Sequence, residues 1–493
     1  MYIGGLDIGT TGCKLSVYDD LGEFAFNSYR EYEVRRQGGT HEIDPSGIFD
    51  AVCQVIREAC ASYELTAIGV TSFGESFVAL DERDEILLPA MLYTDPRGEE
   101  ECRILCDRLG EKRVTEIAGV KPHTMYSLPK MMWIRENLPE VYGQIKRLML
   151  MEDYVVYSLC GVAQIDYSLA ARTMAFDIRE KCWSAELLAA AEIDESLLSR
   201  PVPTGSVAGK MKKALADALG VKNEIVIVSG AHDQVASAVG AGVLAPGEAV
   251  DGTGTVECVT PVFDRIPEEE AVYAEGYSVV PYVFDGTYVC YALSFTGGAT
   301  LKWFRDNFAK RFEGKNVYAE LDRQVSEEPT GILVLPHFAG AANPYMDNGS
   351  RAAMIGLTIE HTAADLYKAL MEGVTYEIMT NIEHLESAGI CPDGLYATGG
   401  GASSDVWMQI KADILGRPVT ALRAKEVGAC GTCMLAGVAT GIYKDLEEAK
   451  KRFVKVRKTY FPRERQYQTY QDYYKAYRRL YDAVRPIVEE LRG

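Results

Sequence analysis

The sequence has no apolar run that reaches the length of about 18 residues that a transmembrane helix needs. No secretory signal opens the chain, and its first residues, 2–6, have instead the apolar character of a β-strand. The twelve cysteines are scattered irregularly, which is typical of reduced thiols rather than of a disulfide framework. We therefore expect a cytoplasmic protein with no membrane partner.

Common metal and phosphate signatures are also missing. The six histidines form no HExxH pair, and the absence of a GxxxxGK[ST] loop excludes a P-loop kinase. One CxxC pair, Cys430 and Cys433, lies in a small-residue stretch predicted to be helical at 428–441. Because no second CxxC and no paired histidines accompany it, we interpret this pair as packing residues, with a redox or zinc role as the alternative.

Positive charge is scarce. Lysine and arginine number 51 against 71 aspartates and glutamates, so the formal net charge is −20. This balance argues against nucleic acid or an anionic membrane as the main partner, although local cations would still admit an anionic substrate. The length of 493 residues and the hydrophobic fraction of 47% predict two or three packed domains.

The most informative stretch lies at 225–255. A short apolar strand at 225–228 precedes Asp233 and a small-residue helix at 234–243, and a second strand then runs into the loop at 251–255, Asp-Gly-Thr-Gly-Thr. Loops of glycine and threonine turn backbone N–H groups and hydroxyls toward phosphates. A carboxylate at the end of a strand can take a proton from a nucleophile. Together the two features predict phosphoryl transfer.

A similar loop occurs at 5–14, GLDIGTTGCK, and is predicted to join the strands of a hairpin. The recurrence of Asp, Gly and Thr in both loops indicates an internal duplication. Asp7 precedes the first loop, where it could hold a Mg²⁺ that neutralises phosphate charge. The alternative is an Asx turn in an ordinary hairpin.

Strands and helices alternate between these loops, which is typical of an α/β fold with ligands beyond the carboxyl ends of its strands. Glu75, Asp95 and Arg97 stand at such ends and are candidates for binding substrate hydroxyls, with solvated loop charges as the alternative. Trp133 lies on the apolar face of a predicted helix and is expected in the core. The predicted elements are a helix at 48–61, a strand at 67–71 continued by 77–80, and a helix at 127–137.

In the second half, apolar spacing predicts a helix over 362–385, and His337 is interpreted as a hydrogen-bonded loop residue rather than a catalyst. The tail at 465–484 has a stripe of tyrosines on one face of a predicted helix. We expect this stripe to dock onto the body of the protein and not to stack on a ligand. Its members are Tyr467, Tyr470, Tyr474, Tyr477 and Tyr481.

Several stretches, which occur in the order of the family's motifs and extend over nearly the whole chain, together resemble the FGGY family of carbohydrate kinases. They are GLDIGTTGCK (5–14), SLPKMMWIREN (127–137), SGAHDQ (229–234), DGTGT (251–255) and ATGGGASSDVWMQIKADILGRPV (397–419). Within the family, residues 164–184 are most similar to xylulokinases. The resemblance implies two actin/Hsp70-like, ribonuclease H-like α/β domains with an interdomain active-site cleft. Residues 1–245 would form the sugar-binding domain and 246–493 the nucleotide-binding domain.

The resemblance also implies roles for individual residues. Asp233 would deprotonate the attacking sugar hydroxyl, and Asp7 would take the Mg²⁺ position. The residues implied in substrate binding are Glu75, Asp95, Arg97, Asp233 and Gln234. Those implied in ATP binding are Thr10, Thr11 and Lys14 in the first loop, Gly252, Thr253 and Gly254 in the second, and Gly297, Gly298, Gly399, Gly400 and Gly401 near the adenosine. For the triple glycine, a simple strand-to-helix turn is the alternative.

The chain departs from the best-known members at Phe73-Gly74-Glu75. Xylulokinases usually carry Gln-Met-His there, and glycerol kinases carry Gln-Arg-Glu. This chain has Gly74 in place of that arginine, which argues against glycerol as the substrate. Fuculokinase-like members carry a similar Thr-Phe-Gly sequence, so a deoxyketose stays an alternative substrate. We expect ATP-dependent phosphorylation of a small ketose such as D-xylulose, with another sugar, a polyol or a sugar acid as alternatives.

Two functions of other classes are alternatives to sugar phosphorylation. A sugar-independent ATPase switch on the same fold would not need polar strand ends, and the two intact loops argue against a non-catalytic sugar sensor. The expected cofactors are ATP and Mg²⁺, and the expected partner is a small sugar. A homodimer is left open.

Overall fold

The computed structural model describes residues 1–268, 270–309, 316–423 and 426–492, which form two compact units. The first unit contains Met1–Leu244, Ser278–Val289 and Glu426–Val454. The second contains Ala245–Tyr277, Cys290–Lys425 and Lys455–Gly493. The chain enters the second unit beside the boundary predicted at 245/246, but it returns to the first unit twice, which the division into two contiguous halves does not include.

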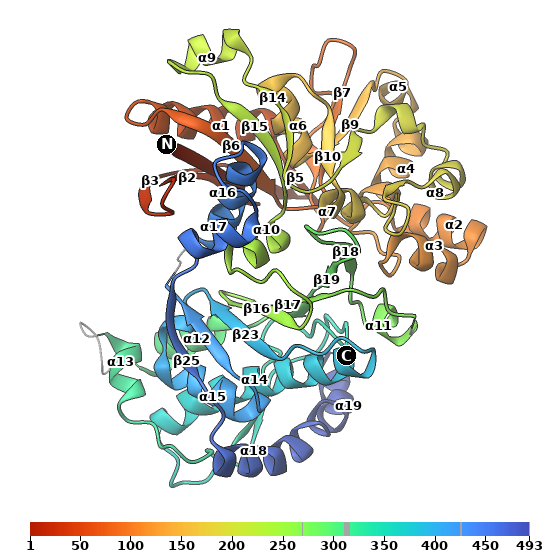
Figure 1. Ribbon diagram of the computed structural model, residues 1–493. Coiled ribbons are helices and arrows are strands. Elements are labelled where there is room, and N and C mark those ends of the chain that lie inside the picture. Colours follow the sequence, from red (N-terminus) through yellow and green to blue (C-terminus); the bar gives the residue numbers. More distant parts are fainter. Residues whose placement is uncertain (269, 310–315, 424–425, 493) are drawn as a thin grey trace. The chain divides into compact units, whose positions relative to one another are not determined.

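The first unit is built on one mixed sheet with the strand order β14-β15-β6-β1-β2-β3. β1 pairs antiparallel with β2, as predicted for the hairpin, and parallel with β6, which in turn pairs parallel with β15. The carboxyl ends of β1, β6 and β15 therefore lie at the same edge (Figure 1). The strands are β1 (Tyr2–Ile8), β2 (Gly12–Asp19), β3 (Phe24–Glu31), β6 (Leu65–Ser72), β14 (Ser206–Lys210) and β15 (Val226–His232).

Two helices, α1 (Pro45–Cys60) and α6 (Met151–Cys160), pack their apolar side chains on one face of this sheet. α1 begins where the Asp44 carboxylate accepts a hydrogen bond from the Ser46 N–H and Pro45 occupies the first turn, both favourable at a helix start. Leu6, Leu15 and Val70 of the sheet are fully buried beneath these helices. This face forms the apolar core of the unit.

The other face carries α10 (Asp233–Gly240) and α16 (Val427–Ala439), and glycines allow an unusually close approach there. A Cβ on Gly5 would lie 2.3 Å from the carbonyl oxygen of Ala429, and one on Gly431 would lie 1.9 Å from that of Ala236. Neither position has room for a side chain, so α16 packs directly on β1 and α10. This packing explains why the 426–454 segment belongs to the first unit.

Cys430 and Cys433 lie inside this packing on α16 as free, buried thiols. The Cys430 thiol donates to the Tyr18 hydroxyl at 3.1 Å, and burial raises the pKa of Cys430 to about 11. The Cys433 thiol donates to the carbonyl oxygen of Ile3 at 3.6 Å. The packing interpretation of the CxxC pair is confirmed.

The sheet of the second unit repeats the pairing of the first. Antiparallel pairing joins β20 to β17 and β17 to β16, and parallel pairing then joins β16 to β23 and β23 to β24. The series β3, β2, β1, β6 and β15 of the first unit has the same order of antiparallel and parallel pairs, and in the second unit β25 pairs antiparallel at the edge. This repetition agrees with the duplication indicated by the two loops. The strands are β16 (Glu248–Thr253), β17 (Glu257–Phe263), β20 (Ala292–Ser294), β23 (Gly394–Thr398), β24 (Val419–Leu422) and β25 (Val456–Tyr460).

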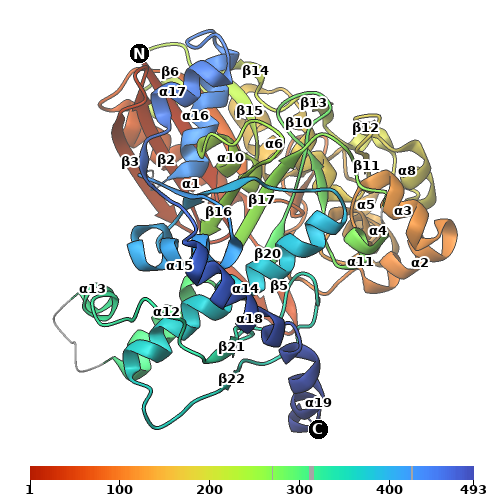
Figure 2. The same cartoon turned by 60° about the horizontal axis from the view of Figure 1, so that its bottom comes forward.

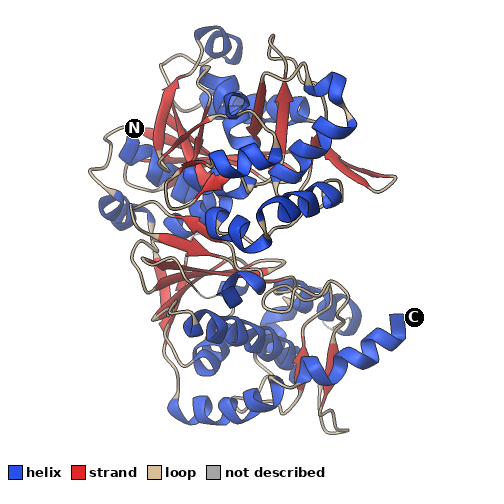
Figure 3. Ribbon diagram, turned by 90° about the vertical axis from the view of Figure 1, so that its right-hand side faces the viewer, coloured by secondary structure: helices blue, strands red, loops and turns tan. Residues whose placement is uncertain are grey.

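The long helix α14 (Ala363–Ser387) begins at a capping box formed by Thr362 and Asp365, close to the predicted start. α15 (Asp405–Leu415) packs against α14 and against α18 (Glu464–Tyr477), and α19 (Leu480–Arg492) follows α18. Figure 2 shows α14 and α18 side by side. The prediction of one helix over the tail is wrong, because the chain breaks between α18 and α19. Figure 3 shows that the chain starts in a strand and ends in α19.

The tyrosine stripe docks onto α14, as predicted. The hydroxyls of Tyr470, Tyr474 and Tyr477 donate to carboxylates of α14 at 2.9, 2.8 and 2.6 Å. His337 is also a hydrogen-bonded residue as predicted, with Nδ1 2.7 Å from the Ser350 hydroxyl and Nε2 3.0 Å from a Glu377 carboxylate oxygen.

The prediction that 77–80 continues the strand at 67–71 is wrong, because the chain turns at Glu75 and β7 pairs with β9 in a separate small sheet. The remaining strands are β4 (Val34–Gln37), β5 (Thr40–Ile43), β7 (Phe77–Leu80), β8 (Ala90–Met91), β9 (Arg147–Leu150), β10 (Gln164–Asp166), β11 (Phe176–Asp177), β12 (Cys182–Trp183), β13 (Arg200–Val202), β18 (Val279–Pro281), β19 (Tyr288–Cys290), β21 (Leu333–Leu335) and β22 (Ala353–Ile355). The remaining helices are α2 (Glu99–Leu109), α3 (Glu111–Ala118), α4 (Ser127–Asn137), α5 (Pro139–Tyr142), α7 (Tyr167–Ala170), α8 (Ala185–Ala191), α9 (Lys213–Leu219), α11 (Glu270–Ala274), α12 (Gly298–Phe308), α13 (Val317–Asp322) and α17 (Leu446–Phe453).

Candidate active site

Three carboxylates gather at the carboxyl edge of the first unit's sheet. Asp7 is the second-last residue of β1 and lies opposite Thr71 of β6, and Ser72 of β6 is in turn opposite His232 of β15. Glu75 follows β6 after a short turn, and Asp233 follows β15 directly. Parallel strands carry their ligands at this edge, so the topology brings together residues that are far apart in sequence.

Asp233 is the first residue of α10, and its side chain is half-buried, with 38% of its surface exposed. Burial, and then the charges of Asp7 and Glu75, raise the pKa of Asp233 to about 7, against the lowering effect of the Gln234 backbone N–H and of Arg172. A carboxylate of this pKa is well matched to proton abstraction near neutral pH. Gln234, predicted to bind substrate, contributes its backbone N–H to this carboxylate.

His232 precedes Asp233 in the chain and is 8% exposed in its side chain. Its Nε2 lies 3.3 Å from Oδ1 of Asp233, and its backbone N–H donates to the Ser168 hydroxyl at 2.8 Å. Burial and the nearby Arg172 hold the pKa of His232 well below its usual range, so the ring is neutral. Asp233 is therefore not neutralised by its neighbour.

Asp7 lies between the hairpin and the first turn of α16. A Cβ on Gly428 would lie 3.5 Å from Oδ2 of Asp7. Burial raises the pKa of Asp7 to about 6, while the charge of Lys14 lowers it and that of Glu426 raises it. Lys14, predicted to contact phosphate, donates to Glu426 at 2.6 Å with 26% of its side chain exposed.

The first loop is held by a backbone bond from the Gly9 N–H to the Gly12 carbonyl at 3.0 Å. A Cβ on Gly12 would lie 2.6 Å from the Arg30 carbonyl oxygen, so the close packing of β3 requires glycine there. Thr10 is half-buried and Thr11 exposed at the tip. The loop is thus a rigid turn with both threonines at its outer side.

Glu75 and Arg172 form a buried ion pair whose charges act on Asp233. Arg172 Nε donates to Oε1 of Glu75 at 2.6 Å, and both side chains are 6% exposed. Glu75 has a φ of 67°, a region that favours glycine, and the Ser127 hydroxyl donates to its backbone carbonyl at 2.6 Å. Arg172 lies over the Tyr126 ring, 5.2 Å from its centroid.

Asp95 and Arg97, the other predicted substrate residues, bind each other. Arg97 donates to both carboxylate oxygens of Asp95 at 2.8 Å and to Glu42 at 2.6 Å. The Asp95 carboxylate also accepts the His41 backbone N–H at 2.7 Å. The Arg97 guanidinium lies 5.2 Å from the centre of the Trp133 ring. Trp133 is half-buried, so the prediction that it lies in the core is wrong.

The second unit contains a cavity of 810 Å³, within the range of ligand-binding sites. It lies between the β16–β17 turn, the start of α12, α13 and the turn after β23. Five of the predicted nucleotide residues line it: Thr253, Gly254, Gly298, Gly400 and Gly401. Trp303, Asp322 and Ser404 line it too and were not predicted, because no phosphate-type signal marks them.

The remaining predicted glycines, Gly252, Gly297 and Gly399, are not among the residues that line the cavity. Two of them fix the loop at 251–255 by close backbone packing. Gly399 has a φ of 81°, and a Cβ there would lie 2.5 Å from the Thr253 carbonyl oxygen. A Cβ on Gly297 would lie 2.9 Å from the Val256 carbonyl oxygen.

A buried cation lies beneath the same loop. Lys411 of α15 donates to the Asp251 carboxylate, to the Thr253 hydroxyl at 2.7 Å and to Glu257 at 2.8 Å, and these groups are fully buried. The Thr253 hydroxyl therefore faces the interior, which leaves its backbone for a ligand. Burial raises the pKa of Glu257, against the charge of Lys411.

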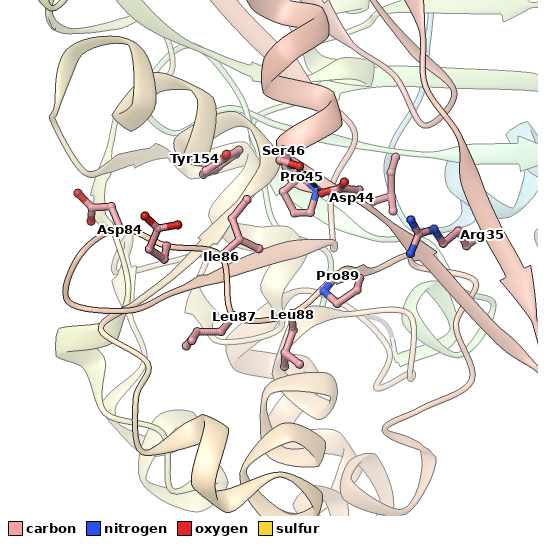
Figure 4. A pocket seen from close by; sticks show the side chains of 12 residues that line it. Arg35, Asp44, Pro45, Ser46, Asp84, Ile86, Leu87, Leu88, Pro89 and Tyr154 are labelled. Atoms are coloured by element: carbon pink, nitrogen blue, oxygen red, sulfur yellow. Dashed lines mark hydrogen bonds between the residues drawn. The ribbon is translucent and has the colours of Figure 1, made fainter.

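A second cavity, of 430 Å³, lies in the first unit near the start of α1 (Figure 4). Two of its lining carboxylates have partners, since Asp44 caps α1 and Asp84 accepts from the Tyr157 hydroxyl at 2.8 Å. None of the residues predicted for substrate or ATP binding lines this cavity. Among the described residues, no cluster of three or more His, Cys, Asp or Glu side chains could hold a metal ion, and no helix is long and apolar enough to cross a bilayer.

Comparison with known proteins identifies the class. The profile of the FGGY family of carbohydrate kinases, N-terminal domain, matches residues 2–240, and that of the C-terminal domain matches residues 252–440. The chain belongs to the FGGY family of carbohydrate kinases, so it is a phosphotransferase with an alcohol acceptor. The family implies ATP as co-substrate and a small-molecule sugar as substrate.

Individual relatives are more distant. A xylulose kinase of Lactococcus lactis subsp. lactis is 27% identical over 469 residues, covering 93% of this chain and 92% of the relative. A gluconokinase of Bacillus subtilis is 28% identical over 467 residues, covering 89% and 88%. A ligand-bound xylulose kinase from Lactobacillus acidophilus shares the fold with a TM-score of 0.90, 24% identity and 99% coverage of both chains.

Proposed function

We propose that the chain transfers the γ-phosphate of ATP to a hydroxyl of a small ketose such as D-xylulose, with Asp233 as the base. The observation that carries this proposal is the place of Asp233, a half-buried carboxylate with a pKa of about 7 at the carboxyl end of β15. At neutral pH about half of such groups are ionised and able to accept a proton. The hydroxyl then attacks the γ-phosphate as Asp233 takes its proton.

The nucleotide would bind in the 810 Å³ cavity of the second unit. Gly400 and Gly401 supply backbone without side chains, against which a flat base can lie. The loop at 251–255 and the start of α12 would direct backbone N–H groups at the phosphates. The first loop, with Thr10, Thr11 and Lys14, would bind the transferring phosphate group.

Asp7 is suited to a Mg²⁺ bound jointly with phosphate oxygens. Mg²⁺ prefers hard oxygen donors and is commonly held by one or two carboxylates together with substrate phosphates. Burial raises the pKa of Asp7 to about 6, and its charge also raises the pKa of Asp233, so a cation beside them would relieve unfavourable negative charge. When bound, Mg²⁺ would neutralise charge on the phosphates.

The sugar would lie in the first unit beside Asp233 and Glu75. Xylulose kinases among the relatives support a ketose, and Phe73-Gly74-Glu75 in place of Gln-Met-His keeps a related ketose as the second candidate. Asp95 and Arg97 would shape this site through their mutual pairing. A cytoplasmic location stays a prediction from composition.

ATP turnover measured with and without a panel of pentuloses, hexuloses, polyols and sugar acids tests the proposal. We expect ADP release only when an acceptor is present, with a phosphorylated sugar formed in equal amount. Equal ADP release without any acceptor would favour the ATPase switch. Acceptor binding without turnover would favour the sugar sensor.

A further inference from the structure

We propose that the Glu75–Arg172 pair makes this site selective for uncharged polyhydroxylated acceptors and against sugar acids. The inference rests on the proposed function and narrows its substrate class. It separates two kinds of relative of nearly equal similarity, since a xylulose kinase is 27% and a gluconokinase 28% identical to this chain.

Gly74 is what allows Arg172 to enter the site. A Cβ at Gly74 would lie 3.0 Å from both Cβ and Cγ of Arg172 and 3.3 Å from Cδ2 of His232. A longer side chain at position 74 would occupy the space that the Arg172 stem takes. Glu75 is turned toward this side chain by its positive φ.

The guanidinium is neutralised within the protein. Two of its nitrogens, Nε and one Nη, contact the same oxygen of Glu75 at 2.6 and 2.5 Å. An acceptor carboxylate would have to compete with Glu75 for Arg172, and buried carboxylate–guanidinium pairs are costly to separate. The charge of Arg172 is therefore already compensated by Glu75 before an acceptor binds.

The groups around this pair carry further negative charge. Asp7 and Asp233 lie at the same edge, His232 is neutral, and Lys14 is bound to Glu426. The buried Lys130 donates to the backbone carbonyls of Asp95 and Thr124. Two like charges about 6 Å apart at an effective dielectric constant of about 20 disfavour association on the order of 100-fold.

The pair nonetheless suits hydroxyl groups. Among the described residues, no hydrogen bond engages Oε2 of Glu75, so this oxygen can accept from a sugar hydroxyl. The carboxylate keeps an acceptor on the site side while the guanidinium fixes its orientation. Hydroxyls bring no charge to be compensated, which is why a neutral sugar is favoured.

The test compares D-xylulose, D-ribulose and xylitol with D-gluconate, by calorimetry with a non-hydrolysable ATP analogue and by steady-state kinetics. We expect the wild-type protein to bind and phosphorylate at least one neutral compound with a kcat/KM about 100-fold or more above that for D-gluconate. Glu75→Gln should lower kcat/KM for the neutral sugar, mainly through KM, and raise the gluconate-to-ketose ratio about 10-fold or more. The matched control is Glu186→Gln, which removes a surface carboxylate paired with Arg113 and should leave the ratio unchanged.

Wild-type selectivity tests the inference even if Glu75→Gln fails to fold. If D-gluconate is bound or phosphorylated equally well as the neutral compounds, the selectivity inference is overturned while the kinase function is left intact. An unchanged gluconate-to-ketose ratio of kcat/KM in a folded Glu75→Gln protein has the same consequence. Selective binding of a neutral compound without phosphoryl transfer supports the selectivity and refutes the proposed function. Binding of no neutral compound in the panel overturns the inference.

Discussion

Replacing Lys411 by methionine should destabilise the protein strongly, because the change leaves Asp251 and Glu257 buried without their cation. All three side chains are fully buried, and Lys411 donates to both carboxylates and to Thr253. Removing one partner of a buried ion pair costs about 3–5 kcal/mol. For a folding unit of this size each kcal/mol lowers Tm by about 2–4 °C, so we expect a fall of about 6–20 °C.

The assay is thermal and urea unfolding followed by circular dichroism, together with the KM for ATP. The KM should rise because Lys411 holds the Thr253 hydroxyl under the second loop. Lys458→Met is the matched control, since Lys458 is 53% exposed and its pair with Asp405 should contribute about 1 kcal/mol or less. A Lys411→Met protein within about 1 kcal/mol of wild type would refute this account of the cluster.

Three further predictions concern other parts of the chain. Glu257→Gln should flatten the dependence of the free energy of unfolding on pH. Burial raises the folded-state pKa of Glu257, so the stability that this carboxyl contributes is full below the unfolded pKa of 4.5 and is lost as pH rises through the folded pKa. Urea titrations at several pH values check this, and the same slope of stability against pH in wild type and variant would contradict it. Gly399→Ala should raise the KM for ATP, because its Cβ would meet the Thr253 carbonyl, whereas Gly389→Ala, with a similar φ of 78° and open surroundings, should not; equal KM values would refute the role of Gly399. Gly431→Ala should lower the free energy of unfolding by about 1–3 kcal/mol or more by forcing α10 and α16 apart, whereas Gly47→Ala, with no atom within 4 Å of its Cβ, should not lower it. Calorimetric unfolding compares the two variants, and equal stabilities would exclude the close packing of α16.

Much of the candidate site follows from local sequence. The loops at 5–14 and 251–255 and Asp233 are recognisable because a tight turn or a strand end imposes its residue types within a few positions. The hairpin of β1 and β2 and the helix α14 were predictable for the same reason. Their positions depend on hydrophobic period and on turn chemistry, which a single stretch contains.

Other features depend on contacts between distant residues and could not be predicted. Arg172 pairs with Glu75 across 97 positions, and Lys411 reaches Asp251 across 160. The return of α16 to the first unit depends on the absence of side chains at Gly5 and Gly431, which its own sequence does not reveal. Trp133 occupies an apolar helix face but lies under Arg97, because a cation can cover an aromatic ring.

The central claim is that Asp233 accepts the proton of the acceptor hydroxyl. The most direct measurement is the pH dependence of kcat and kcat/KM for wild type, Asp233→Asn and the surface control Asp217→Asn, with the best acceptor of the panel. We expect wild-type kcat/KM to rise through about pH 7, and Asp233→Asn to lose this limb and about 10²–10⁴ in kcat with little change in ATP binding. An Asp233→Asn enzyme that phosphorylates sugar at a rate near wild type would contradict the account.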